Sequence, residues 1–82
     1  MSKVKLLFFA TFRDRTGTKT AEINVPAGTT VRVLKERISE TYPGLKQFIG
    51  SALVAVNREY ASEDMIVPDD ADVALFPPVS GG

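Results

Sequence analysis

Residues 4–12 read Val4-Lys5-Leu6-Leu7-Phe8-Phe9-Ala10-Thr11-Phe12, and this stretch decides the fold of the 82-residue chain. Every second residue is apolar, beginning at Val4 and ending at Phe12. In an extended strand these side chains share one face, so the alternation predicts a long first strand with one buried side. The polar run at residues 13–18 predicts a turn after it, because Gly17 can adopt a positive φ.

A second strand and a helix are predicted next. The strand covers residues 20–25 and ends at Pro26-Ala27-Gly28, so that it forms a hairpin with the first. Thr29 or Thr30 offers an N-cap oxygen to a helix that runs to about Tyr42. One face of this helix is apolar and the others are charged. The apolar residues are Val31, Leu34 and Ile38, and the charged ones are Arg32, Lys35, Glu36, Arg37 and Glu40.

The remaining chain predicts further strands on the same sheet. We expect a packed loop or short turn at residues 45–50, strands at residues 53–57, around Tyr60 and at 72–76, and turns at 57–59 and 68–71. This order is the β-grasp, ubiquitin-like arrangement, an α+β fold in which a mixed sheet of 4–5 strands packs on one main helix. The first and last strands are the most apolar and should be neighbours at the sheet centre. One domain is expected over residues 1–78, followed by a flexible tail over residues 79–82.

The composition excludes most chemistry that the chain could perform alone. It has no cysteine and no histidine, so the usual nucleophile–base pairs and zinc sites cannot be assembled. Its six glycines do not form a phosphate-cradling loop. We therefore expect no bound cofactor and no metal, and a chain that works in a complex rather than as an enzyme by itself.

The charges cancel overall but are unevenly distributed. Residues 1–41 carry eight Lys or Arg against four Asp or Glu, and residues 42–82 carry two against six. The acidic residues are either solvated turns or an acidic collar around the tail that meets a basic partner. A neutral balance without a basic cluster argues against nucleic acid. No apolar run is long enough for a membrane span and no signal peptide is present, so a cytoplasmic location is expected.

The C-terminal end reads Phe76-Pro77-Pro78-Val79-Ser80-Gly81-Gly82. Pro77 and Pro78 stiffen the stalk, and four further residues reach about 13–14 Å. Gly81 and Gly82 lack side chains, so the terminal carboxylate can pass through a narrow opening. The ending predicts that Val79 to Gly82 insert into a partner and that Gly82 reacts there. An inert, disordered end is the alternative.

A carboxylate anion resists nucleophilic attack and must be activated first, for example as an acyl-adenylate. Because the chain has no ATP-binding motif, the activating enzyme must be another protein. Because it has no cysteine, any sulfur placed on the terminus must come from outside the chain.

The C-terminal ending and three internal stretches of the chain resemble those of the small subunit of molybdopterin synthase. This subunit belongs to the MoaD-like branch of the ubiquitin-like sulfur carriers in the MoaD/ThiS superfamily. The matching stretches are the tail from Phe76 to Gly82, residues 7–10 of the first strand, residues 55–59 and residues 68–73. The resemblance implies that an E1-like adenylating enzyme activates Gly82 with ATP. A sulfurtransferase then supplies sulfur for a C-terminal thiocarboxylate.

The same resemblance implies the acceptor and the main partner. The tail inserts into the large synthase subunit, with which the chain forms a heterotetramer, and Gly82 donates sulfur to a cyclic pterin phosphate to build the molybdopterin dithiolene. Three alternatives stay open: a ubiquitin-like modifier that joins Gly82 to lysines, a carrier for thiamine synthesis or RNA thiolation, and a β-grasp interaction module with an inert tail.

Strand parity also predicts a partner-binding face. Phe9 and Phe76 fall on the parity opposite the core-facing residues, so they should be exposed near the tail, together with Tyr60. Arg13, just beyond the first strand, would add a polar contact at the rim. A loop that covers both phenylalanines is the alternative.

Overall fold

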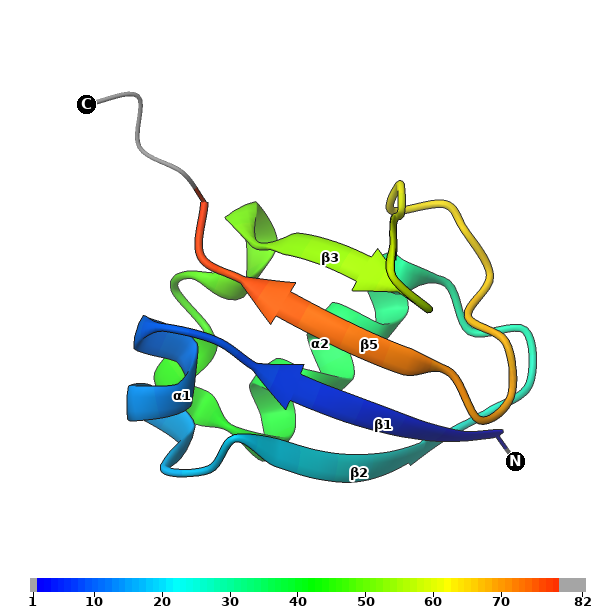
Figure 1. Ribbon diagram of the computed structural model, residues 1–82. Coiled ribbons are helices and arrows are strands. Elements are labelled where there is room, and N and C mark those ends of the chain that lie inside the picture. Colours follow the sequence, from blue (N-terminus) through cyan, green and yellow to red (C-terminus); the bar gives the residue numbers. More distant parts are fainter. Residues whose placement is uncertain (1, 79–82) are drawn as a thin grey trace.

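The computed structural model describes residues 2–78, and the chain forms a strongly twisted sheet with helices on one side (Figure 1). The elements are β1 (Ser2–Phe8), α1 (Thr11–Thr16), β2 (Thr20–Val25), α2 (Val31–Thr41), the 3₁₀ turns η1 (Pro43–Leu45) and η2 (Ile49–Ser51), β3 (Leu53–Val56), β4 (Glu59–Tyr60) and β5 (Asp72–Phe76). The predicted tail, residues 79–82, lies outside the described residues. No helix within residues 2–78 is long and apolar enough to cross a membrane.

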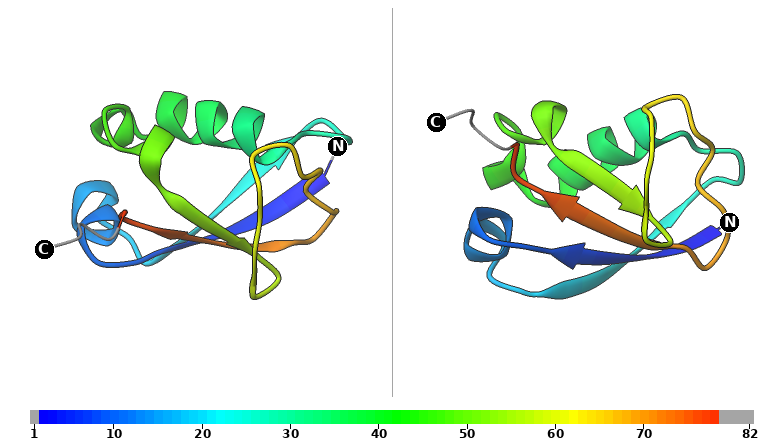
Figure 2. Two further views of the ribbon diagram at one scale, coloured as in Figure 1. Left: turned by 90° about the horizontal axis from the view of Figure 1, so that it is seen from above. Right: turned by 45° about the horizontal axis from the view of Figure 1, so that its top comes forward.

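The sheet has the order β2-β1-β5-β3-β4, with β1 and β5 parallel at its centre. All other neighbouring strands are antiparallel, including the predicted hairpin of β1 and β2. Helix α2 lies across one side of the sheet, and the other side is left uncovered (Figure 2). The predicted α+β, β-grasp fold is therefore confirmed, as is the placing of the first and last strands at the centre.

The core forms between α2 and the covered side of the sheet. Its fully buried side chains come from both central strands, α2 and the segment after it. They include Val4, Leu6, Val31, Leu34, Ile38, Leu45, Val73 and Leu75. Phe8 adds an edge-to-face contact with Tyr42, at 5.3 Å between ring centroids. Alternation along β1 and β5 thus fills the core, because every second residue points toward α2.

The first strand is shorter than predicted, since it ends at Phe8 rather than at Phe12. Ala10 turns the chain with φ 53° and ψ −126°, and residues 11–16 form helix α1 where a turn was expected. Phe12 is nevertheless buried, with 1% of its surface exposed, because the helix points it back at the core. Apolar residues at positions 8 and 12 fit a helical spacing of four as well as a strand spacing of two, so the pattern could not separate them.

Helix α2 begins where the sequence predicts. The Thr30 hydroxyl accepts a hydrogen bond from the Val33 N–H at 3.3 Å, which satisfies one free donor of the first turn. Lys35, predicted on a solvated face, is instead buried, with 7% of its surface exposed. Its ammonium donates to Glu63 Oε1 at 3.0 Å and to the Gly50 carbonyl at 3.3 Å. One side chain therefore ties α2 to η2 and to the loop at residues 61–71.

Three of the acidic residues after β4 hold a loop in place. Glu63 and Asp64 pair with Arg32 at 3.4 and 2.9 Å, and Asp69 accepts the Lys3 backbone N–H at 3.0 Å. The loop that carries them lies at the end of the sheet where β5 begins, whereas the chain leaves the sheet at the opposite end (Figure 1). These residues fasten a loop to α2 and β1, and the predicted collar concerns residues 79–82, which lie outside the described residues.

The buried position of Phe12 predicts a large loss of stability in Phe12→Ala. Removing a fully buried phenylalanine side chain costs about 3–5 kcal/mol, since the surrounding structure closes only part of the cavity. Urea unfolding followed by circular dichroism measures this loss. A change below about 1 kcal/mol would mean that α1 does not hold the ring in the core.

The ion pairs of Glu63 predict an acid-sensitive stability. The hydrogen bond that Lys35 donates to this carboxyl and the positive charge of Lys35 hold its pKa below the ordinary value of 4.5, and Arg32 adds a smaller effect in the same direction. A lowered pKa in the folded state stabilises the fold above the unfolded value, and this contribution is lost as the pH falls through the lowered pKa. Melting temperatures recorded from neutral to acid pH should decline less steeply below 4.5 in Glu63→Gln than in the wild-type chain. Parallel curves would contradict the role of this pair.

Candidate functional site: the uncovered side of the sheet

The side of the sheet that faces away from α2 is here called the open face. Its side chains come from alternate residues of the strands and from the turn between β3 and β4. They include Lys3, Lys5, Leu7 and Phe9, Glu22, Leu53, Ala55, Arg58 and Tyr60, and Asp72, Ala74 and Phe76. The end from which the chain leaves β5 is aromatic, and the other end is charged. The face therefore offers an apolar surface next to the tail.

Phe9 and Phe76 form the centre of the aromatic end. Their rings stack with centroids 4.8 Å apart and an angle of 12° between the planes. The Phe9 N–H also donates to the Leu75 carbonyl at 3.3 Å, which holds the residue after β1 against β5. Phe9 is 42% exposed, as strand parity predicts, and Phe76 is half-buried by the stack. The alternative, a loop that covers both rings, is wrong.

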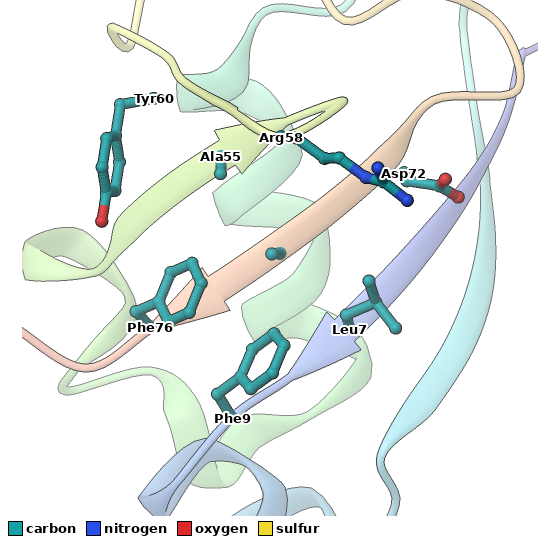
Figure 3. A pocket seen from close by; sticks show the side chains of 8 residues that line it. Leu7, Phe9, Ala55, Arg58, Tyr60, Asp72 and Phe76 are labelled. Carbon is teal, nitrogen blue, oxygen red and sulfur yellow. The ribbon is translucent and has the colours of Figure 1, made fainter.

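A depression of about 370 Å³ lies on the open face beside this stack, as Figure 3 shows. Its lining residues are Leu7, Phe9, Ala55, Arg58, Tyr60, Asp72, Ala74 and Phe76. Tyr60 is the most exposed of the large apolar side chains, at 77%. The structure thus brings three of the predicted partner-binding residues, Phe9, Phe76 and Tyr60, to one depression. An apolar depression with a few polar groups at its edge is suited to a side chain of another protein.

Arg13 lies apart from this depression. It stands on α1 and lines a neighbouring hollow of about 390 Å³, together with Leu7, Phe9 and Lys19. The two hollows share Leu7 and Phe9, so Arg13 adjoins the aromatic pair from the far side. Arg13 was predicted just past a strand, and the unexpected helix accounts for its displacement.

Sequence reasoning missed Arg58 and Asp72 as members of the face. Asp72 follows from the parity of β5, since it shares a side with Ala74 and Phe76. Arg58 carried no such signal, because a residue in a turn has no strand parity. Its position depends on the backbone conformation of the turn, which a hydrophobic pattern does not report.

The tail begins directly beside the aromatic pair. β5 ends at Phe76, and Pro77 and Pro78 follow without forming further strand. Val79, Ser80, Gly81 and Gly82 lie outside the described residues, so their predicted insertion and the predicted reaction at Gly82 stay predictions. Within residues 2–78 no group of three His, Cys, Asp or Glu gathers that could hold a metal ion. The described residues offer a binding surface next to a chain end, rather than a set of acid–base groups.

The model of the ThiS family matches residues 6–82, which is almost the whole chain. The chain belongs to the ThiS family. A relative from Escherichia coli (strain K12), named molybdopterin synthase sulfur carrier subunit, is 36% identical over 81 residues, which cover 96% of this chain and 99% of the relative. The membership predicted from the tail and the three internal stretches is confirmed.

Solved structures of this family and of ubiquitin-like proteins agree with the fold. A putative molybdopterin converting factor, subunit 1, from Pyrococcus furiosus is 34% identical, with a TM-score of 0.88 and coverage of 96% of this chain and 100% of the other. SAMP1 from Haloferax volcanii is 26% identical, with a TM-score of 0.85 and coverage of 99% and 100%. Subunit 1 in a complex with subunit 2 of the molybdopterin-converting factor from Helicobacter pylori is 23% identical, with a TM-score of 0.66 and coverage of 98% and 99%, and supports the fold alone.

Proposed function

We propose that this chain is the sulfur-carrier small subunit of a molybdopterin synthase. The single observation that carries the proposal is the family match. It extends from residue 6 to Gly82 and therefore covers both the β-grasp domain and the C-terminal ending. The Escherichia coli relative of nearly equal length bears this name, and so does a human relative that is 31% identical. The open face and the tail then have one purpose, since the face would bind the partner into which the tail inserts.

The chemistry of the proposal takes place at the carboxylate of Gly82. An E1-like adenylating enzyme would join this carboxylate to AMP and release pyrophosphate from ATP. Sulfur delivered by a sulfurtransferase, and reduced to the level of sulfide by a thiol, would displace AMP and leave a thiocarboxylate. The thiocarboxylate would then donate its sulfur to the cyclic pterin phosphate, and the carrier would return as a carboxylate. This chain would bind no cofactor itself, because ATP and the sulfur donor would act through partners.

The partners follow from the same proposal. The large synthase subunit would cover the open face with an apolar surface that receives Phe9, Phe76 and Tyr60, and two copies of each subunit would form a heterotetramer. Aromatic side chains in a shallow apolar depression are typical anchors of protein interfaces. All these steps would take place in the cytoplasm.

A ubiquitin-like modifier is the second candidate, and the likeness to SAMP1 favours it. That protein is a small archaeal modifier protein by name, and its structure covers 99% of this chain at 26% identity. Both functions would need activation of Gly82 and would differ only in the acceptor, which is a lysine amine in one and a pterin in the other. The acceptor is therefore what an experiment must separate.

The carrier proposal predicts a product without ATP. A chain prepared chemically with a Gly82 thiocarboxylate should convert the cyclic pterin phosphate to molybdopterin when mixed with the large synthase subunit. Fluorescence of the oxidised pterin measures the yield. Deleting Gly82 should abolish it, because the reacting carbon is then displaced by about 3.5 Å.

The deletion should leave urea unfolding within about ±0.5 kcal/mol of the wild-type value, which separates lost chemistry from lost fold. Absence of product from the thiocarboxylate, together with lysine conjugates in a cell extract supplied with ATP, would favour the modifier instead.

The aromatic anchor predicts a selective effect of Phe9→Ala. Binding to the large subunit, measured by isothermal titration calorimetry, should weaken about tenfold or more, as is typical of a central aromatic contact. Val33→Ala is the matched control, because Val33 is exposed to a similar extent, 39% against 42%, but stands on α2. Equal affinities of the two variants would contradict the assignment of the open face.

A further inference from the structure

Arg58 occupies a backbone conformation that arginine rarely adopts. With Asn57 it forms the two-residue turn between β3 and β4, in which Val56 pairs with Glu59. Both turn residues have positive φ, 50° at Asn57 and 74° at Arg58. A hairpin turn of this kind strongly favours glycine at its second position, since a Cβ is strained in the left-handed region.

Asn57 has a structural reason for its conformation, and Arg58 makes no comparable hydrogen bond among residues 2–78. Asn57 tolerates a positive φ, and its side-chain oxygen accepts the Asp72 N–H at 2.9 Å. Its own N–H donates to the Asp72 carbonyl at 2.8 Å, which links the turn to β5. The side chain of Arg58 takes part in none of the hydrogen bonds or ion pairs found among residues 2–78. Within that part of the chain, glycine would serve the fold better.

The strained backbone conformation of Arg58 places its positively charged side chain on the open face. The Arg58 side chain extends across the sheet toward Asp72, and both residues line the depression whose other end is formed by Phe9, Tyr60 and Phe76 (Figure 3). A strained residue whose side chain makes no hydrogen bond or ion pair among residues 2–78 is a candidate for a functional role. Arg58 lies on the surface that the proposed function already assigns to a partner.

The charges of the open face indicate the chemistry of what Arg58 binds. Lys3 and Glu22 neutralise each other in an ion pair of 3.1 Å. Lys5 and Arg58, with Arg13 and Lys19 at the neighbouring hollow, then stand against Asp72, so the face keeps an excess of positive charge around an apolar centre. A partner surface that matches it has apolar side chains at its centre and an acidic side chain opposite Arg58.

We propose that Arg58 is a partner-specificity residue, which binds a carboxylate on the large synthase subunit where that subunit covers the depression. The inference rests on the proposed function and adds the chemistry of the contact. A guanidinium can hold a carboxylate through two parallel hydrogen bonds, and neighbouring apolar side chains exclude the water that weakens such a pair at an open surface. With arginine at position 58, the turn would be less stable than with glycine, and the complex with the large subunit would be more stable.

The replacement of Arg58 by glycine tests the inference, because its two effects have opposite signs. Arg58→Gly should raise the Tm by about 2–5 °C, since the strain at the positive φ is relieved. The same variant should weaken binding to the large subunit about tenfold, mainly through a faster dissociation rate. Differential scanning calorimetry and surface plasmon resonance measure the two quantities.

Asp70→Gly is the matched control. Asp70 also has a positive φ, 58°, and is exposed, but it does not line the depression. Its replacement should raise the Tm without weakening the complex. Arg58→Lys should recover part of the affinity, because the charge is kept, and Arg58→Glu should bind more weakly than Arg58→Gly, because it places two carboxylates together.

The outcomes separate this inference from the proposed function. If the wild-type chain does not bind the large subunit, both are overturned. If the wild-type chain binds and Arg58→Gly binds equally well, the proposed function stands and the role of Arg58 is overturned. If Arg58→Glu binds as tightly as Arg58→Lys, the contact is not with a carboxylate and the inference fails.

Discussion

The parallel pairing of β1 with β5 is the constraint on which the rest of the structure depends. It joins the first strand of the chain to the last, with Leu6 beside Val73 and Phe8 beside Leu75. Both strands then have neighbours on each side, which is why all their inward residues except Ser2 are apolar. The same pairing brings Phe9 against Phe76, so the chain leaves the sheet at an aromatic surface that distant parts of the sequence build together.

Alternation along these two strands divides the molecule into a covered and an uncovered side. The covered side holds the core under α2, and the uncovered side holds the open face, with the aromatic stack and Arg58. The proposed carrier function would give this division a purpose, since a carrier needs a stable body and a surface that a partner recognises. The described residues contribute position and recognition, and the proposed chemistry lies at the chain end and in the partners.

Hydrophobic periodicity, with the N-cap threonine, was enough to predict the fold, the boundaries of α2 and the exposed side of Phe9. It failed at Phe12, because apolar residues four apart satisfy both a strand and a helix, and tertiary packing decided for the helix. It failed at Lys35, because burial of a charge depends on a carboxylate 28 residues away in the chain. It could not predict that Arg58 lies on the open face, because the position of this side chain depends on the backbone dihedral angles of the turn. The part of the site beyond Pro78 was predicted from covalent chemistry alone.

The central position of β5 has a consequence for how the protein is made. A nascent chain cannot complete its sheet until the last strand has been synthesised. β5 lies between β1 and β3, and without it these two strands are not joined. The contact that closes the fold spans nearly the whole sequence, and such contacts form late in folding. A prematurely terminated chain that lacks β5 therefore has no closed core and no aromatic stack, so the aromatic surface forms only on chains that extend at least to Phe76.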